Sequence, residues 1–275
     1  MARSRVDLPG ALALVTGAGS GIGRATAMAL AARGASVLAV DIDEVAAERT
    51  AAECRERGAA IAGARRVDVA DRGAMEVLAD EVHGTHGPLD VLVNNAGVGM
   101  TGRFTDTTLD DWAWIRSINL DGVVHGCALF GPAMLERRRG HVVNVASALG
   151  YVATATEPDY VTTKAGVLAL SQCLRADWRR DGVGVSAVCP GVVDTPIITE
   201  GTRFRGDQAS PTTRRRTERV FKRGHRPEQV AAAIVGAIER DRAVVPVGWE
   251  ARAGWALHRL APLAVQQLLA RGGRR

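Results

Sequence analysis

Cysteine is scarce in this chain. The 275 residues include four cysteines, Cys54, Cys127, Cys173 and Cys189, which lie far apart and form no C-x-x-C pair. Cysteine ligands of structural zinc sites are closely spaced, and small disulfide scaffolds are rich in cysteine. We therefore expect neither a metal site nor a disulfide framework, and a reducing compartment such as the cytoplasm.

Long apolar runs and linker segments are also missing. No apolar run reaches the roughly 18 residues that a membrane span needs. The run from Leu8 to Val15 has the look of a short signal peptide, but it continues into a glycine-rich turn, which indicates a strand. Proline, glycine and serine are scattered. These absences favour one large domain over residues 1–249, followed by an amphipathic helical tail over residues 250–275.

Excess charge of one sign is confined to one segment. The net charge is +5, but residues 203–226 hold nine Lys or Arg and two Asp or Glu, so the other residues sum to −2. A nucleic-acid-binding protein would present a broad basic face, so we expect no nucleic-acid partner. The basic segment is open to two interpretations: a solvated loop, or a contact for an anionic substrate such as an acyl thioester that carries phosphates.

The chain is organised around a glycine-rich turn at residues 16–23. An apolar run of strand length precedes it, and residues 24–33 have helical composition. Strand, glycine turn and helix in this order form a phosphate-binding unit. Gly17 can supply the tight turn, Gly21 leaves room for a pyrophosphate, and Gly23 lets the helix lie close to the sheet. The amide groups of the first helical turn would then face the anion.

Strands and helices alternate along most of the chain. This order predicts parallel strands joined by right-handed crossovers. We therefore expect an α/β fold, a single doubly wound Rossmann-type domain with a seven-stranded parallel sheet and helices on both faces. The expected strands are 11–15, 36–40, 61–67, 89–93, 141–146, 183–189 and 243–247.

Two stretches depart from this alternation. Residues 108–139 form one long helical stretch, with expected bends at Gly122, Gly126, Gly131 and Pro132. Residues 195–226 are polar, basic and irregular, and they follow a strand. Long loops after strands of an α/β sheet lie over the ligand crevice, so we expect a mobile lid here.

Asp41 ends the second expected strand, 18 residues after Gly23. A carboxylate at about this spacing accepts hydrogen bonds from the adenosine ribose and repels a 2′-phosphate. Because no basic residue follows at once, we expect NAD rather than NADP. The alternative role for Asp41 is a helix N-cap, although Asp43 is the better cap candidate.

Tyr160 and Lys164 stand four residues apart on an expected helix and so share one face. Tyrosine alone is a poor acid or base near neutral pH, because its reference pKa is about 10. An adjacent ammonium favours the phenolate, so we expect Lys164 to lower the pKa of Tyr160. Ser147 follows the fifth strand and can hydrogen-bond a substrate oxygen. Each of these residues taken alone is weak support for catalysis.

Several motifs occur together in one fixed order, and the set is far more specific than any member: Thr16-Gly-x-x-x-Gly-x-Gly23, Asn94-Asn-Ala-Gly97, Asn119, Ser147, Tyr160-x-x-x-Lys164, Pro190-Gly191 and Thr195. With them the chain resembles the short-chain dehydrogenase/reductase superfamily, in its soluble form of roughly 250 residues, over about residues 11–247. The stretches that start at Asn95, His125 and Val185 further resemble an actinobacterial group in which such a domain can follow an α/β-hydrolase domain.

This resemblance implies a role for each matching residue. Tyr160 would be the general acid or base, Lys164 would lower its pKa and hold the nicotinamide ribose, Ser147 would orient the substrate oxygen, and Asn119 would hold a relay water. Asp41 would bind the adenosine ribose. The cofactor-binding set would comprise Gly17, Ser20, Gly21, Ile22, Gly23, Asp41, Asp68, Val69, Asn94, Asn95, Ala96, Gly97, Tyr160, Lys164, Pro190, Gly191, Val193 and Thr195.

The resemblance further implies hydride transfer between NAD(H) and a secondary alcohol or ketone, a reaction at a CH–OH group. We expect a largely apolar substrate, because the loops at residues 99–106 and 148–159 and the lid supply Met100, Phe104, Tyr151, Val152, Ile197, Ile198 and Phe204. The alternatives are a 3-oxoacyl-thioester reductase that uses NADPH, and a non-catalytic dinucleotide-binding regulator.

Two expectations concern partners. Members of the superfamily are usually homotetramers or homodimers, which use the helices at 108–139 and 160–180. The tail, bent or broken at Pro262, is expected to pack against the core or another subunit, and the alternative is an interfacial helix that touches anionic lipid.

Overall fold

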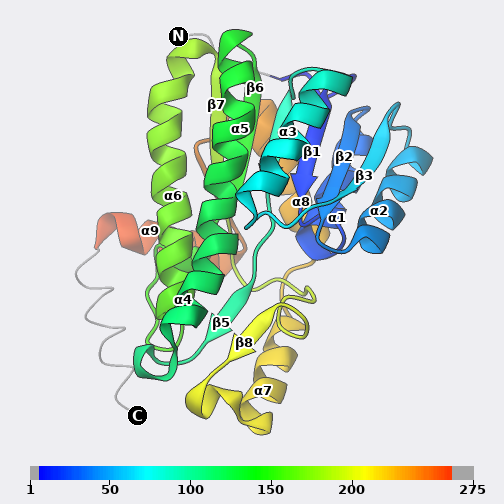
Figure 1. Ribbon diagram of the computed structural model, residues 1–275. Coiled ribbons are helices and arrows are strands. Elements are labelled where there is room, and N and C mark those ends of the chain that lie inside the picture. Colours follow the sequence, from blue (N-terminus) through cyan, green and yellow to red (C-terminus); the bar gives the residue numbers. More distant parts are fainter. Residues whose placement is uncertain (1–5, 262–275) are drawn as a thin grey trace.

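The computed structural model describes residues 6–261 and places seven parallel strands in one sheet, in the order β3-β2-β1-β4-β6-β7-β9 (Figure 1). The predicted fold class is confirmed, and each expected strand is present within a few residues. The strand order reverses beside β1, where an open α/β sheet forms its ligand crevice. The strands are β1 Leu12–Thr16, β2 Ser36–Asp41, β3 Ala62–Arg66, β4 Val91–Asn94, β6 Gly140–Val145, β7 Val183–Pro190 and β9 Val244–Val247.

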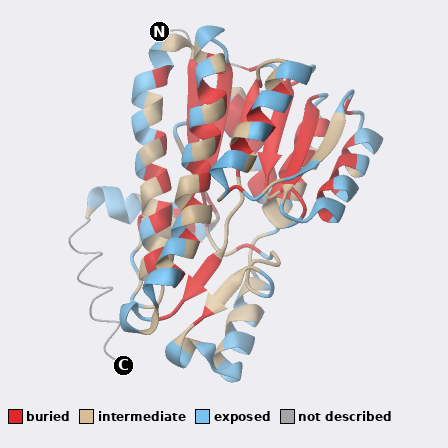
Figure 2. Ribbon diagram, in the orientation of Figure 1, coloured by how far each residue is buried: buried red, intermediate tan, exposed pale blue. Residues whose placement is uncertain are grey.

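Helices cover both faces of this sheet. On one face, Leu30 of α1 and Ile234 of α8 pack in a cluster with Val37 of β2. On the other face, Phe130 of α5 packs in a second cluster with Leu92 of β4. The central strands are therefore buried on both sides, which explains their nearly continuous apolar sequences (Figure 2). The helices are α1 Gly21–Ala31, α2 Glu44–Glu56 and α8 Pro227–Arg240 on the first face, and α3 Arg72–His86, α5 Gly122–Glu136 and α6 Pro158–Trp178 on the second.

Side chains that cap helices set several of these boundaries. The Asp43 carboxylate accepts a hydrogen bond from the Ala46 amide at 3.1 Å and so caps α2. Asp43, rather than Asp41, is thus the N-cap of α2, and Asp41 ends β2 with a carboxylate that does not cap a helix. Helices α6 and α8 each begin with a proline, whose fixed φ suits the first helical position.

The expected long helix at 108–139 is divided. Helix α4, Leu109–Arg116, runs into a π-helical turn at Ser117–Asp121, and α5 follows. The bend thus lies just before Gly122, and Pro132 lies inside α5. A π-helical turn inserts one residue into the helix, which re-aims the side chains of that turn. Asn119 is one of these and is fully buried.

The stretch Leu109–Glu136 is long and apolar enough to cross a membrane, by length and composition only. Buried core helices meet the same criterion. Val123, Phe130 and Met134 of this stretch are buried in the core that covers one face of the sheet. Their packing accounts for the apolar sequence.

The expectation that the lid segment is irregular is wrong, because residues 195–226 contain a strand and a helix. Strand β8, Thr202–Phe204, pairs in parallel with β5, Gly99–Thr101, to make a second, two-stranded sheet. Helix α7, Pro211–Phe221, follows and lies at the bottom of Figure 1. Ser210 caps α7, and Pro211 takes its first position. Within the described chain, none of the eleven residues of α7 is buried.

The last described helix, α9, spans Trp249–Leu260. The Tyr151 hydroxyl donates to the Ala251 carbonyl at 2.7 Å, and the Tyr151 and Trp255 rings meet edge to face with centroids 5.2 Å apart. This start of the predicted tail therefore packs on the domain. The remainder of that tail lies outside the described residues.

Candidate active site

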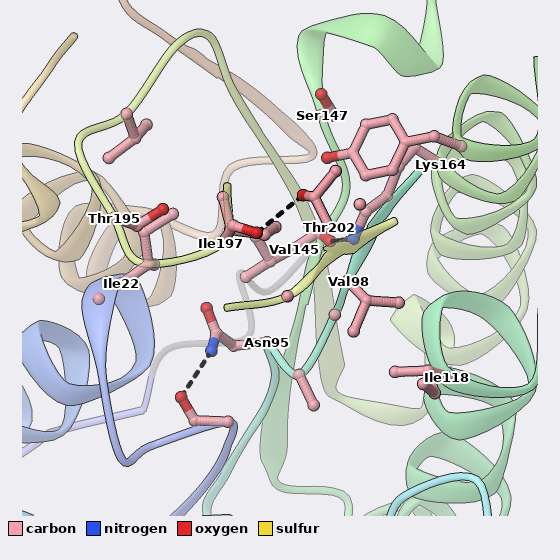
Figure 3. Close-up of a pocket in the computed structure, with 18 of the residues that line it drawn as sticks. Ile22, Asn95, Val98, Ile118, Val145, Ser147, Lys164, Thr195, Ile197 and Thr202 are labelled. Carbon is pink, nitrogen blue, oxygen red and sulfur yellow. Dashed lines mark hydrogen bonds between the residues drawn. The ribbon is translucent and has the colours of Figure 1, made fainter. Parts of the chain in front are cut away.

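A cavity of about 930 Å³ opens at the carboxyl ends of β1, β2, β4, β6 and β7 (Figure 3). It gathers residues that are as far apart in the sequence as Gly17 and Glu250. Gly23, Asn94 and Asn119 belong to the predicted set but do not line the cavity. The predicted residues that do line it are Gly17, Ser20, Gly21, Ile22, Asp41, Asp68, Val69, Asn95, Ala96, Gly97, Ser147, Tyr160, Lys164, Pro190, Gly191, Val193 and Thr195.

The glycine turn brings the start of α1 very close to the end of β1. Gly17 has φ +62°, a left-handed conformation that glycine adopts without strain. A Cβ added at Gly23 would lie 1.9 Å from the Gly17 carbonyl oxygen, so the packing leaves no room for a side chain there. The Ser20 side chain makes no capping hydrogen bond, and Ser20 lines the cavity. The turn therefore offers an uncapped helix N-terminus to an anion.

Asn95 fastens this turn to the end of β4. Its side-chain amide donates to the Thr16 carbonyl at 2.9 Å and to the Gly17 carbonyl at 3.2 Å. The Asn94 side chain points into the core, where its amide donates to Asn144 at 2.9 Å. The expectation that Asn94 lines the cofactor is therefore wrong for its side chain, because that side chain is buried on the other side of the strand.

Asp41 presents its carboxylate at the edge of the cavity. One oxygen accepts from the Gly19 amide at 2.8 Å and the other from the Asp43 amide at 3.0 Å. These backbone donors fix the carboxylate beside the glycine turn. The guanidinium of Arg66, on the neighbouring strand, donates to the Ile42 carbonyl and does not line the cavity.

Ser147, Tyr160 and Lys164 meet at the opposite end of the cavity. Ser147 follows β6 and caps the 3₁₀ turn Ala148–Gly150. Tyr160 lies in the first turn of α6, and the Lys164 ammonium lies 5.8 Å from the centroid of its ring. The ammonium donates to the Val145 carbonyl at 3.0 Å, which holds Lys164 under the end of β6.

The expected effect of Lys164 on the pKa of Tyr160 is not seen in the chain alone. Burial raises the pKa of Tyr160 to about 12, although a hydrogen bond with Ser147 opposes the rise. Burial also lowers the pKa of Lys164 to about 8. The sequence-based expectation considered the ammonium and not the cost of desolvating the phenolate, and burial is the larger of the two effects.

Asn119 sits behind the catalytic candidates rather than in the cavity wall. Its side chain accepts from the Val98 amide at 2.8 Å and donates to the Val98 carbonyl at 2.9 Å. A Cβ added at Gly97 would lie 3.2 Å from the Asn119 side-chain oxygen and 3.3 Å from the Lys164 ammonium. Asn119 and Lys164 therefore approach each other across Gly97.

The basic segment at 203–226 turns its first arginines away from the cavity. The Arg205 guanidinium binds the buried Asp111 carboxylate at 2.7 Å and 2.9 Å, and it holds the pKa of Asp111 down at about 2 although burial opposes this. Arg203 contacts the same carboxylate at 3.3 Å and stacks on Trp114, with 3.8 Å to the ring centroid. Within residues 6–261, Lys164 is the one cation among the residues that line the cavity.

The expected apolar specificity residues divide into two groups. Met100, Val152, Ile197 and Ile198 line the cavity. Phe104 is exposed against Trp112, Tyr151 holds α9, and Phe204 lies under Arg214. The loop prediction thus identified the correct segments but not the direction of each side chain, because direction follows from strand pairing and tertiary packing.

Three further carboxylates line the cavity and were not predicted from the sequence: Glu157, Glu200 and Glu250. Glu157 lies in a segment already assigned to substrate contacts. Glu250 had been assigned to the tail, yet it accepts a hydrogen bond from the Val192 amide at 3.0 Å and faces His225 at 3.0 Å. No local motif marks either residue, because tertiary packing alone brings them to the cavity.

Comparisons with known proteins agree with this geometry. A family model described as short chain dehydrogenase matches residues 11–205. Probable oxidoreductase EphD of Mycobacterium tuberculosis is 42% identical over 260 residues, which are 93% of this chain and 44% of that protein. The chain thus spans less than half the length of this relative. D-threitol dehydrogenase of Mycolicibacterium smegmatis is 41% identical over 69% of this chain and 73% of that protein.

A solved structure is also similar over nearly the whole chain. The crystal structure of a short chain dehydrogenase/reductase from Burkholderia phymatum in complex with NAD has a TM-score of 0.83 and 31% identity, and 96% of each chain is covered. A short chain dehydrogenase/reductase with the same fold therefore binds NAD.

Proposed function

The chain belongs to the short chain dehydrogenase family and is an oxidoreductase, and from this premise we propose that it transfers a hydride between NAD(H) and a secondary alcohol or ketone. Tyr160 is the general acid or base, and Ser147 and Lys164 assist it. The observation that carries the proposal is the meeting of these three side chains in one cavity with the glycine turn. Because the chain covers only part of the longer relative, the proposal concerns this dehydrogenase unit.

The site is shaped for a dinucleotide. Gly17, with its left-handed backbone, and the closely packed Gly23 carry no side chains, so the backbone at the start of α1 is accessible. An accessible helix N-terminus suits a pyrophosphate. Asp41 would hold the adenosine ribose, Asp68 and Val69 would contact the adenine, and Val193 and Thr195 would hold the nicotinamide end. The cofactor, when bound, accepts or supplies the hydride, and the chain supplies position and proton handling.

Tyr160 transfers the proton to or from the substrate oxygen. With a pKa of about 12 in the chain alone, its hydroxyl is protonated near neutral pH and suits the protonation of a ketone oxygen. Oxidation of an alcohol requires a lower pKa, and the Lys164 ammonium beside the ring favours the phenolate. Ser147 hydrogen-bonds the Tyr160 hydroxyl and would direct it to the substrate oxygen.

The test is Tyr160→Phe, which removes the hydroxyl and keeps the ring. We expect NADH binding, measured by calorimetry, to stay within about twofold, while turnover of any accepted alcohol falls by about 10²- to 10⁴-fold, the usual contribution of a positioned acid or base. Turnover at the wild-type rate would refute the role of Tyr160. Cofactor binding without turnover in the wild type across a broad alcohol panel would favour the non-catalytic regulator.

The 3-oxoacyl-thioester reductase is less well supported by the site. That alternative draws on the basic segment, yet Arg203 and Arg205 bind Asp111 instead of facing the cavity. Asp41 would also repel the 2′-phosphate of NADPH.

A further inference from the structure

Of the two carboxylates within a helical turn of the proposed acid or base, Asp159 is buried and accepts from the Tyr160 amide, whereas Glu157 lines the cavity. Glu157 is the N-cap residue of α6, three positions before Tyr160, and both line the cavity. Tyr160 lies in the first turn of α6, so the two residues are separated by less than one helical turn and border the same cavity. The negative charge of Glu157 contributes to the raised pKa of Tyr160, which reflects how near the two groups are.

The contacts of Glu157 are hydroxyl groups rather than cations. The Thr154 hydroxyl donates to its Oε2 at 3.2 Å, and the Thr101 hydroxyl also hydrogen-bonds it. Among the ion pairs of residues 6–261, none involves Glu157. A carboxylate has about four acceptor positions, so two hydroxyl donors leave capacity for further donors.

Because Glu157 is partly buried, an acceptor position of its carboxylate that has no hydrogen-bond donor costs free energy. Burial raises the pKa of the Glu157 carboxyl, and the hydrogen bond from Thr154 opposes the rise. Met100, Leu149 and Val152 supply apolar surface to the same cavity. A partly buried carboxylate in apolar surroundings gains most from a ligand group that donates a hydrogen bond.

The cavity lining disfavours an anionic substrate. Within the described chain, Lys164 is the one cation that lines the cavity, and it is held by the Val145 carbonyl. Glu200 and Glu250 add two more carboxylates to the lining. A substrate carboxylate placed here would face like charges without an arginine to bind it.

We propose that Glu157 determines substrate specificity by accepting a hydrogen bond from a second donor group of the substrate, a hydroxyl or a protonated amine. Thr101 and Thr154 hold its carboxylate in place. The inference rests on the proposed dehydrogenase function and narrows its substrate class to small alcohols that carry such a donor besides the reacting hydroxyl. It also assigns discrimination against carboxylate-bearing substrates to Glu157.

Four compounds with the same carbon chain test this inference: butan-2-ol, butane-2,3-diol, 3-aminobutan-2-ol and 3-hydroxybutanoate. We expect kcat/KM for NAD-dependent oxidation of the diol or the amino alcohol to exceed that of butan-2-ol by about 10- to 100-fold, the scale of one hydrogen bond to a charged group. 3-Hydroxybutanoate should be the poorest substrate.

Two variants of Glu157 distinguish the contribution of a hydroxyl donor from that of an amine donor. Glu157→Leu removes the acceptor and should bring the diol and the amino alcohol down to the level of butan-2-ol. Glu157→Gln keeps an acceptor without charge, so it should retain the diol preference, lose the amine preference and improve the turnover of 3-hydroxybutanoate. Asp110→Asn, an exposed carboxylate on α4 outside the cavity, is the matched control and should change none of these ratios.

The outcomes distinguish the two proposals. Two results would overturn the role of Glu157 and leave the dehydrogenase function standing. One is oxidation of butan-2-ol as fast as that of the diol or the amino alcohol. The other is a ratio of kcat/KM between these compounds and butan-2-ol that Glu157→Leu leaves unchanged. Turnover of none of the four compounds calls for calorimetry of the diol with the protein and NADH. Diol binding that Glu157→Leu weakens about tenfold would support the Glu157 contact, and binding that it leaves unchanged would overturn it.

Discussion

Glu250 reaches from the first turn of α9 to the backbone of Val192 and accepts its amide at 3.0 Å. Its other oxygen faces His225 at 3.0 Å, and His225 in turn bonds the backbone of Val192 and Asp194. One carboxylate therefore joins α9, the segment after β7 and the residues that lead into α8. That segment carries Val193 and Thr195, the residues assigned to the nicotinamide end.

Glu250→Ala should loosen this segment without touching Tyr160. We expect KM for NAD to rise about tenfold, the cost of one or two lost hydrogen bonds, with kcat reduced less. Glu250→Gln keeps an acceptor for the Val192 amide and should recover most of the loss. Steady-state kinetics with varied NAD gives the comparison, and an unchanged KM in Glu250→Ala would show that the link does not position the segment.

Asp41 should decide the choice between the two nicotinamide cofactors. Calorimetric titration of the wild type is expected to give tighter binding of NADH than of NADPH, because the carboxylate repels the 2′-phosphate. Asp41→Ala should narrow this difference, mainly by weakening NADH. Glu44→Gln, an exposed carboxylate in the first turn of α2, is the control. Tighter binding of NADPH by the wild type would reverse the assignment and bring the thioester reductase forward.

Gly23→Ala should damage the cofactor site through sterics alone. Its added methyl group would lie 1.9 Å from the Gly17 carbonyl, so α1 must shift away from the turn. We expect NADH affinity to fall by at least tenfold. At Gly84, in α3, a Cβ meets nothing within 4 Å, so Gly84→Ala should leave binding unchanged and raise stability by up to about 1 kcal/mol. Equal affinities in both variants would argue against the close approach at Gly23.

His141 should make stability depend on pH. It is fully buried at the start of β6 on Ser186, and burial lowers its pKa to about 4. The unfolded chain therefore binds the proton more readily, so this contribution is complete above pH 6.5 and is lost as the pH falls towards 4. The loss approaches about 3 kcal/mol, from a pKa difference of about 2.5 units.

Urea unfolding of wild type and His141→Asn at several pH values isolates that contribution. The variant should be less stable at pH 7, and the gap between the two proteins should close as the pH falls towards 4. A gap that stays constant over this range would mean that His141 does not titrate as burial requires.

The sequence predicted the parts of the molecule that local patterns encode. The apolar run before residue 16, the glycines after it and the strand-length runs up to 243–247 were sufficient for the sheet and its crevice, because strand periodicity and glycine turns are local properties. Most residues of the predicted site indeed line one cavity. Their assignment depended on the order of motifs, not on any single residue.

The parts that the sequence did not reveal depend on contacts between distant segments. The π-helical turn that buries Asn119 reflects packing against Val98, which no helical pattern encodes. Arg203 of β8 and Arg205 after it both bind Asp111, which lies 92 residues before Arg203, so neither faces a ligand in the cavity. Likewise the pKa of Tyr160 depends on how deeply the ring is buried, which the spacing to Lys164 does not report.

Helix α7 contributes no buried residue to the described chain, although it carries much of the positive charge. Substitutions at exposed positions of α7, such as Arg215 and Arg216, change the free energy of folding very little. These exposed positions can therefore accumulate changes under selection for surface properties alone, while Phe221 stays constrained by the cavity that it lines, and β8 by its strand partner and by Asp111. Among proteins that descend from this chain, sequence differences should be concentrated at these exposed positions. Few differences should fall on the residues that line the cavity.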